Sequence, residues 1–293
     1  MPSIPSDLEE LRRRLDEIDD RLHGLLIERA EIISKVAASK RVGNLAAFQP
    51  GREADIIRRL VDRHHGPFPA ATLVRMWREM LAATVRLQTP FAVAVFAPIG
   101  SLGYWDLARD HYGSHTPMSA YRSIRQVIRA VTEGQAAVGV LPMPQEGESD
   151  PWWRHLLSTD QSAPRVIARL PFGPRGNART DGADALAIGR GVDQETGIDR
   201  TLLATETAPD ISRSRILRTL SSLGLVCTFF ATSEHVGGAL NLIELEGFVR
   251  VSDPRLESLR VQLGPALYRV LPFGGYAVPL AAAALATADA AID

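Results

Sequence analysis

The chain has 293 residues, 45% of them hydrophobic, which suffices for two or three domains with packed cores. Its 33 basic and 34 acidic residues nearly cancel, so no overall basic field favours nucleic acid or an anionic membrane. Any cationic site must be local, and a small anionic ligand fits such a site better than DNA. The first ten residues lack the features of an export signal, and no apolar run reaches the roughly 18 residues that span a bilayer. We therefore expect a cytoplasmic protein.

A long amphipathic helix is predicted from Ser6 to about Lys40. Ser6 and Glu9 match a capping box, and apolar residues then recur at alternating spacings of three and four. This apolar stripe consists of Leu8, Leu11, Leu15, Ile18, Leu22, Leu25, Ile32 and Val36. Arg29 occupies one position of the same series. We expect the stripe to be buried against partner helices, where a guanidinium group needs an anion.

Two shorter helices are predicted at Arg52–Arg63 and Ala71–Gln88, so residues 1–90 form an all-helical domain. An α/β domain is expected at 91–190. Its predicted strands are 91–96, 137–141, 166–170 and 183–188, and its helices 104–112 and 121–133. Residues 171–182 predict an exposed loop with two solvated arginines, and Trp152, Trp153 and His155 are expected to pack on the core.

The last domain, 191–280, shows a ferredoxin-like order of strand, helix, strand, strand, helix, strand. These elements are predicted at 200–205, 211–223, 225–233, 239–246, 254–263 and 268–271. An Ala-rich tail, 281–293, is too short for a membrane anchor. The expected fold class is multidomain, α followed by α/β. The single cysteine, Cys227, is interpreted as a core thiol because no acid or base pattern surrounds it.

The basic residues of the first helix carry the strongest functional pattern. Lys35 and Lys40 are the only lysines of the chain, and all other basic residues are arginine. This bias indicates that position 40 requires the compact charge of an ammonium group. The alternative is that both lysines lie on a solvated face. Lys40 follows Arg29 by eleven residues, so the two side chains point within about 20° of the same direction around the helix axis. Arg12 lies about 25 Å from Arg29 along the axis, too far to touch the same small molecule. If Arg12 serves that site, it comes from a second copy.

Together these residues resemble the all-helical class of chorismate mutase over residues 7–88. The matching segments are Leu8-Glu-Glu-Leu-Arg12, Ile18-Asp19, Leu25-Leu26-Ile27-Glu28-Arg29, Val36, Lys40, Arg52-Glu53, and Thr84 with Gln88. Proteins of that family are intertwined dimers whose long first helix crosses between two active sites. The resemblance therefore implies a homodimer in which Arg12 is donated across the interface.

The resemblance also implies a role for each polar position. Arg29 and Arg12 of the partner subunit match the clamps for the substrate carboxylates. Lys40 and Gln88 match the donors to the ether oxygen of chorismate. No cofactor or metal is expected, because the rearrangement of chorismate to prephenate is intramolecular and needs only a reactive conformer and stabilised charge.

Four further positions complete the implied site. Arg52 matches an additional cation, and Glu53 matches the acceptor for the ring hydroxyl. Thr84 stands where the family often has serine, and Gln49 stands where an acidic residue is common. The alternative for the whole set is a helical dimerisation domain with solvated arginines.

The rest of the chain resembles parts of prephenate dehydratase and its ACT regulatory domain. The matching segments are Pro98-Ile-Gly100-Ser101, Val131–Ala136, Val140-Leu-Pro142 and, for the ACT part, 200–280. The Thr-Arg-Phe motif of the dehydratase is absent, and Thr232-Ser-Glu-His235 replaces the expected Glu-Ser-Arg-Pro. We expect a module without dehydratase activity that braces the dimer or binds an aromatic amino acid. Glu234 and His235 could contact such an effector, but a solvated turn is favoured.

Three alternatives to a mutase with a regulatory module stay open. The first is a bifunctional chorismate mutase and prephenate dehydratase. The second is an isochorismate pyruvate-lyase-like enzyme on the same helical fold. The third is a non-catalytic aromatic sensor or structural dimer.

Overall fold

A computed structural model describes residues 6–43, 46–160, 162–176, 179, 184–191, 194–282 and 285. Contacts divide the chain into two compact units. Unit 1 is Met1–Ala47 with Thr84–Pro90, and unit 2 is Phe48–Ala83 with Phe91–Asp293. This division differs from the predicted boundaries at 90 and 190, because two of the predicted N-terminal helices pack with the α/β part. Most of the predicted tail, 281–293, lies outside the described residues.

Helix α1, Ser6–Val42, confirms the predicted long helix and belongs to unit 1. At 37 residues it is about 55 Å long. Its apolar stripe is exposed in the single chain, with Leu15 59% and Leu25 60% accessible. The carboxylates of Asp7 and Glu9 in the first turn interact favourably with the positive end of the helix dipole. The side chain of Ser6, the predicted cap, is outside the described part.

Helices α2, Pro50–Arg63, and α3, Ala70–Gln88, begin within two residues of their predicted starts. Pro50 occupies the first turn of α2, where its missing N–H costs no hydrogen bond. Within unit 2 the apolar faces of α2 and α3 meet Phe172 in the loop after β4. The core of this cluster is Ala54, Ile57, Val61, Ala70, Val74, Leu81, Phe172 and Leu285. Burial of Phe172 therefore ties α2 and α3 to the α/β part.

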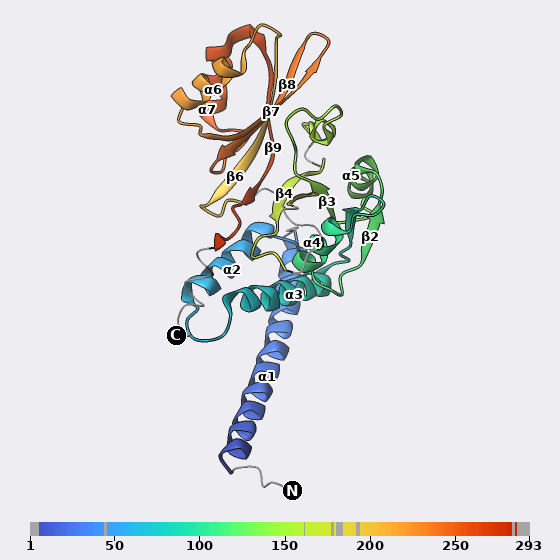
Figure 1. Ribbon diagram of the computed structural model, residues 1–293, viewed down its shortest axis with the longest axis vertical. Helices are drawn as coiled ribbons and strands as arrows, with labels where there is room; N and C mark the ends of the chain where they lie inside the picture. Colours follow the sequence, from blue (N-terminus) through green and yellow to red (C-terminus); the bar gives the residue numbers. More distant parts are fainter. Residues whose placement is uncertain are drawn as a thin grey trace. The chain divides into compact units, whose positions relative to one another are not determined.

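The described residues of unit 2 form one nine-stranded sheet of order β2-β1-β3-β5-β4-β9-β6-β8-β7 (Figure 1). The first five strands are β1 Val93–Phe96, β2 Met118–Tyr121, β3 Val138–Pro142, β4 Arg165–Leu170 and β5 Ala185–Gly189. Helices α4, Gly103–Tyr112, and α5, Ile124–Thr132, and a 3-10 turn, Trp152–Leu156, accompany them. Trp152 and Trp153 lie in the main hydrophobic core, as predicted, but His155 is exposed, which corrects the prediction for that residue.

Strand β2 corrects one prediction. Tyr121 was expected to begin a helix, but it ends β2, and α5 begins at Ile124. The strand pairs in parallel with β1 at the edge of the sheet, and its side chains are half-buried or exposed. An edge strand of this kind needs no continuous apolar run, so the hydrophobic pattern does not reveal it.

The predicted ferredoxin-like order is confirmed in the second half of unit 2. It runs β6 Asp199–Thr207, α6 Arg213–Ser222, β7 Cys227–His235, β8 Gly238–Glu246, α7 Pro254–Leu263 and β9 Leu267–Ala277. The four strands are antiparallel in the order β9-β6-β8-β7. Ser212 and Asp253 cap the two helices by accepting backbone N–H groups. Both helices cover the same face of these strands (Figure 1).

Strands β4 and β9 join the two halves of the sheet through the pair Val166 and Gly274. A Cβ atom on Gly274 would lie 2.2 Å from the carbonyl oxygen of Val166, and its φ is +130°. Only glycine allows so close an approach. On the β6–β8 strands, Leu203 and Ile243 face the helices, whereas Leu202 and Leu242 join the core of the α/β part. Both faces are therefore buried.

Candidate functional site

The basic residues predicted on α1 occupy one continuous helix. Arg29 is half-buried, and burial lowers the pKa of its guanidinium group, which stays charged at neutral pH. Lys40 is also half-buried, and its Nζ donates to the carbonyl oxygen of Ala47 at 3.1 Å. Arg12 is exposed, seventeen residues before Arg29 on the same straight element. Arg12 and Arg29 of one chain therefore cannot share one small ligand.

Gln88 and Thr84 come from the last turn of α3, which belongs to unit 1 with α1. Gln88 Nε2 donates to the carbonyl oxygen of Thr84 at 3.0 Å. Its Oε1 is buried, with no hydrogen-bond partner among the described residues. Thr84 itself is 7% exposed. Unit 1 thus contains five of the predicted site residues, Arg12, Arg29, Lys40, Thr84 and Gln88.

The other three predicted site residues, Gln49, Arg52 and Glu53, lie at the start of α2 in unit 2. Gln49 precedes the helix, and its carbonyl oxygen accepts the backbone N–H of Glu53 at 3.1 Å. Arg52 is exposed, whereas Glu53 is 8% exposed. Arg78 of α3 donates from Nη1 to Glu53 Oε2 at 3.1 Å, and both side chains are buried. Glu53 therefore has a structural partner in addition to its predicted role toward substrate.

Arg78 is a buried cation that the sequence interpretation did not include. Its guanidinium lies 4.9 Å from the ring centre of Phe172, in addition to its ion pair with Glu53. Burial lowers the pKa of Arg78, and the Glu53 carboxylate opposes that shift. The sequence does contain a signal for a buried Arg78, because this residue falls on the same helical face as Val74 and Leu81. Arg29 has the same kind of position in the apolar stripe of α1.

Two aromatic residues of α4, His111 and Tyr112, complete this buried cluster. Burial, and secondarily the charge of Arg78, lower the pKa of His111 well below its usual 6.5. Burial and the Glu53 carboxylate raise the pKa of Tyr112, although Arg78 opposes the shift. His111 is therefore neutral in the folded protein at neutral pH. The imidazole packs edge-on against Tyr112, with ring centres 4.7 Å apart.

The neutrality of His111 predicts a loss of stability in mild acid. At this residue the unfolded chain takes up a proton near pH 6.5 and the folded chain does not. The contribution of His111 to the free energy of unfolding is therefore complete above that pH and declines below it. Between pH 7.5 and 5.5 the wild type should lose about 1.4 kcal/mol more than His111→Phe, which keeps the ring. Urea unfolding at the two pH values measures this difference. Equal losses in both proteins would show that His111 titrates normally when folded.

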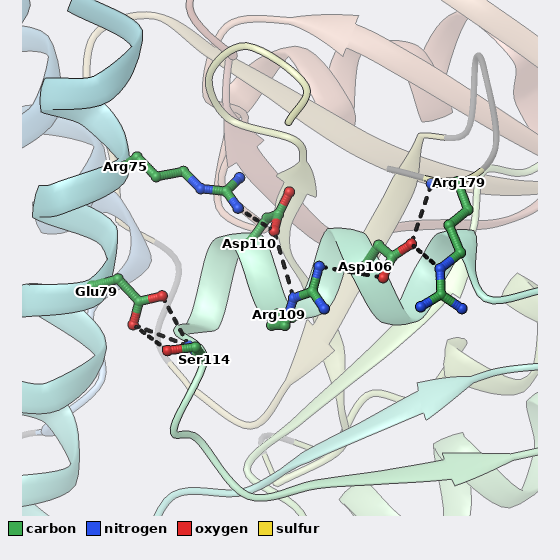
Figure 2. A network of polar contacts seen from close by, with 7 residues as sticks. All are labelled: Arg75, Glu79, Asp106, Arg109, Asp110, Ser114 and Arg179. Carbon is green, nitrogen blue, oxygen red and sulfur yellow. Dashed lines mark hydrogen bonds and ion pairs between the residues drawn. The ribbon is translucent and has the colours of Figure 1, made fainter. Parts of the chain in front are cut away.

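A network of exposed and buried charges joins α3 to α4 (Figure 2). Arg75 of α3 pairs with Asp110 at 2.6 Å, and Glu79 accepts from the backbone and hydroxyl of Ser114. Asp106, whose side chain is 2% exposed, accepts the backbone N–H of Arg179 at 3.2 Å. The contacts of Arg75 and Glu79 therefore hold α3 beside α4, and the contact of Asp106 holds the loop 171–182.

The arginines of the loop 171–182 are not simply solvated, which corrects the prediction. Arg179 lies beside Asp106, with Nε 3.5 Å from Oδ2, and Arg175 pairs with Asp184 (Figure 2 shows the first pair). Asp106 is 73 residues from Arg179 and Asp184 follows the loop itself, so the loop composition could not indicate either acid.

The remaining predicted features are ordinary parts of the fold. His235 ends β7 and lies 3.7 Å from Glu206, and Glu234 is exposed, so both stand where the strand enters its hairpin turn. Burial raises the pKa of Cys227, whose thiol donates to the carbonyl oxygen of Phe229. A raised pKa does not suit a nucleophile. No cluster of three metal-ligating side chains is found within the described ranges.

Comparison with known families finds a match for the helical segment. Residues 11–89 match the family model described as chorismate mutase type II. The helical segment is therefore similar to type II chorismate mutases. All eight predicted site residues lie inside the match, including Gln49, Arg52 and Glu53 of unit 2.

Curated relatives extend this similarity beyond the mutase domain. The bifunctional chorismate mutase/prephenate dehydratase of Pseudomonas aeruginosa is 32% identical over 149 residues, covering 48% of this chain and 40% of the relative. The enzyme of the same name from Stutzerimonas stutzeri is 28% identical over 151 residues, covering 50% and 41%. Both alignments are longer than the segment from 11 to 89. The chain nevertheless spans only about two fifths of the length of these relatives.

Solved structures show looser likenesses to about two thirds of the chain. One described as a novel type of quorum quenching acylase aligns over 65% of this chain and 95% of its own, with a TM-score of 0.49 and 13% identity. Prephenate dehydratase from Arthrobacter aurescens, in complex with L-Phe, covers 69% and 98%, with a TM-score of 0.47 and 15% identity. Both scores are below 0.5, so neither likeness carries a conclusion on fold or function. Across the described helices, none has the length and hydropathy needed to cross a bilayer.

Proposed function

We propose that this protein converts chorismate to prephenate in the cytoplasm, without a cofactor. The observation that carries the proposal is the family match over residues 11–89, which contains each residue expected to contact the substrate. Three of them, Arg29, Lys40 and Gln88, lie together in unit 1. Relatives that match this chain are named for the same activity.

The chemistry of the reaction suits these side chains. Chorismate is a dianion, and its rearrangement is intramolecular, with no proton transfer or covalent intermediate. Catalysis therefore requires only that the reactive conformer be held and that charge on the breaking ether oxygen be stabilised. Arg29 provides a partly desolvated cation for a carboxylate, and desolvation strengthens such a pair.

Lys40 and Gln88 are the proposed donors to the ether oxygen. Each is held by a bond to a backbone carbonyl oxygen, of Ala47 and Thr84 respectively. An ammonium group has three N–H donors and a carboxamide has two, so each can keep this bond and still donate to a substrate oxygen. Gln88 is neutral at every relevant pH and needs no prior protonation to act as a donor.

The exposed stripe of α1 supports a homodimer. Leu15, Ile18, Leu22 and Leu25 are 48–60% accessible in the single chain. A monomer rarely leaves a continuous apolar row of this length in water, and a second copy of α1 offers a matching row. We propose that the two first helices pack together and that Arg12 of the partner subunit reaches the site containing Arg29.

An assay of the purified chain tests the proposal directly. Loss of chorismate absorbance is followed, and the product is identified by its mass and by its conversion to phenylpyruvate in acid. We expect prephenate as the product. A folded protein that leaves chorismate unchanged would overturn the proposal, and release of pyruvate from isochorismate would favour the lyase-like alternative.

A bifunctional mutase and dehydratase is the second candidate, because the relatives carry that name. The sequence opposes it, since residues 91–190 are about half of what a two-lobed dehydratase needs and no Thr-Arg-Phe motif occurs. Enzymatic formation of phenylpyruvate from prephenate at neutral pH would establish the second activity. Without it, the C-terminal part has a structural or regulatory role.

Regulation by an aromatic amino acid is a separate proposal for the ferredoxin-like part. Its support is the ferredoxin-like topology and the resemblance to ACT domains over 200–280. Calorimetry with phenylalanine, tyrosine and tryptophan tests it. Heat from one of them would identify the effector, and no heat from any would leave only the bracing role.

A further inference from the structure

A pocket with a volume of about 460 Å³ lies within unit 2. This volume is within the range of small-molecule sites, about 300–1,000 Å³. One wall is the shared end of β3, β4 and β5, and the other is the face of β6–β8 that α6 and α7 do not cover. Its lining is Tyr104, Met143, Pro144, Gln145, Arg169, Asp184, Leu186, Leu202, Thr228, Phe229, Leu242 and Glu244. None of these belongs to the mutase domain.

Glu244 stands out in this lining because it occupies a core position of β8. Alternate residues of a strand share a face, so Leu240, Leu242 and Glu244 lie on one side. Leu240 and Leu242 pack on the α/β core, and Ile243 and Leu245 face the helices. Glu244 is only 7% exposed. A carboxylate thus replaces an apolar side chain at a buried, inward-facing position.

The described partners of Glu244 are neutral. Thr228 Oγ1 donates to Oε1 at 2.6 Å, and the Tyr276 hydroxyl donates to Oε2 at 2.5 Å. Burial and the Glu244 carboxylate raise the pKa of Tyr276, so the phenol stays protonated. In the described part of unit 2 no basic side chain forms an ion pair with Glu244. A buried carboxylate is costly unless a cation compensates it.

The arginine in the pocket already has an acidic partner. Arg169 Nη2 pairs with Asp184 Oδ2 at 2.8 Å, and Arg175 contacts the other oxygen of Asp184. Arg175 lies outside the lining. Within the lining Arg169 and Asp184 cancel formally, which leaves the carboxylate of Glu244 as its net charge. A ligand with one positive charge would therefore neutralise the pocket.

We propose that this pocket binds a small primary amine with an apolar body, and that the ammonium group pairs with Glu244. Leu186, Leu202, Phe229 and Leu242 provide an apolar wall for the body of the ligand. The ring of Phe229 offers an additional favourable contact for a cation. The site is independent of the proposed mutase activity, since no residue is shared.

Calorimetry on the full chain tests the proposal with two probes that share a phenylethyl body and carry opposite charges, 2-phenylethylamine and 3-phenylpropionate. We expect the amine to bind with one site per chain and the carboxylate to bind at least about tenfold more weakly. The substitution Glu244→Gln keeps an acceptor for Thr228 and removes the charge, and it should weaken amine binding at least about tenfold. The matched control is Glu246→Gln, an exposed residue of the same strand paired with Arg200.

A second variant tests the pocket independently in case Glu244→Gln does not fold. Met143 is half-buried in the lining, so Met143→Trp should fill the pocket and abolish amine binding while the circular dichroism stays native. The proposal is overturned if the amine does not bind, if the carboxylate binds as tightly, or if amine binding survives either Glu244→Gln or Met143→Trp.

Discussion

Replacing Lys40 by alanine is expected to lower kcat for chorismate rearrangement at least about a hundredfold. Lys40 is the proposed cation at the ether oxygen, where negative charge develops as the bond breaks. A donor aimed at developing charge typically contributes about 2.7–4 kcal/mol, which corresponds to this loss of rate. Gln88→Ala should have an effect of similar size. Steady-state kinetics at saturating chorismate measure both.

Lys35→Ala is the matched control for this experiment. Lys35 is the other lysine of the chain, lies on the same helix and is exposed. We expect its turnover to equal that of the wild type. Near-wild-type kcat in Lys40→Ala would remove Lys40 from the catalytic set, and an equal loss in Lys35→Ala would indicate a general effect on α1.

Replacing Arg78 by alanine is expected to reduce the free energy of unfolding of unit 2 by about 3–5 kcal/mol. The change removes the guanidinium that pairs with the buried Glu53 carboxylate and that packs on Phe172. Removing one member of a buried ion pair costs more than the pair itself contributes. Urea denaturation followed by tryptophan fluorescence measures the change, since Trp77, Trp152 and Trp153 lie in unit 2.

Arg75→Ala serves as the control for Arg78. Arg75 is one turn earlier on α3 and pairs with Asp110, but its side chain is 46% exposed. The Asp110 side chain is 11% exposed, but Arg109 Nε lies 3.9 Å from the same carboxylate oxygen, so the variant should unfold nearly as the wild type does. If Arg78→Ala costs no more than Arg75→Ala, the buried cluster does not stabilise the attachment of α2 and α3 in unit 2.

The sequence predicts the elements with regular patterns well. The apolar residues at spacings of three and four predict the end of α1 within two residues of where it is observed. Helix α7, Pro254–Leu263, is predicted at its observed limits. The ferredoxin-like order follows from strands that are apolar on both faces. These features are local, so hydrophobic periodicity and helix caps are sufficient to identify them.

Features that depend on distant partners are not predicted. Arg175 and Arg179 sit in a polar loop, and their acids lie on other segments. The assignment of α2 and α3 to unit 2 depends on Phe172, which is more than eighty residues away from α3. Arg78 could have been noticed from its place in an apolar stripe, but its partner Glu53 is on another helix.

The substrate roles of the predicted site residues stay predictions from the family resemblance. The structure adds that Gln88 and Lys40 are oriented by backbone carbonyl oxygens, and that Glu53 is held by Arg78. These contacts explain how each side chain is positioned before a ligand arrives. They also link the stability of unit 2 to the mutase domain, because α3 carries both Arg78 and Gln88.

Complementation between two inactive variants tests most directly whether two copies of the chain build each active site. Arg12→Ala and Lys40→Ala are co-expressed with different tags, and the heterodimer is isolated through both. If Arg12 acts across the interface, one site carries both substitutions and the other carries neither, so the heterodimer should show about half the wild-type turnover. A heterodimer as inactive as both parents would contradict a site assembled from two copies.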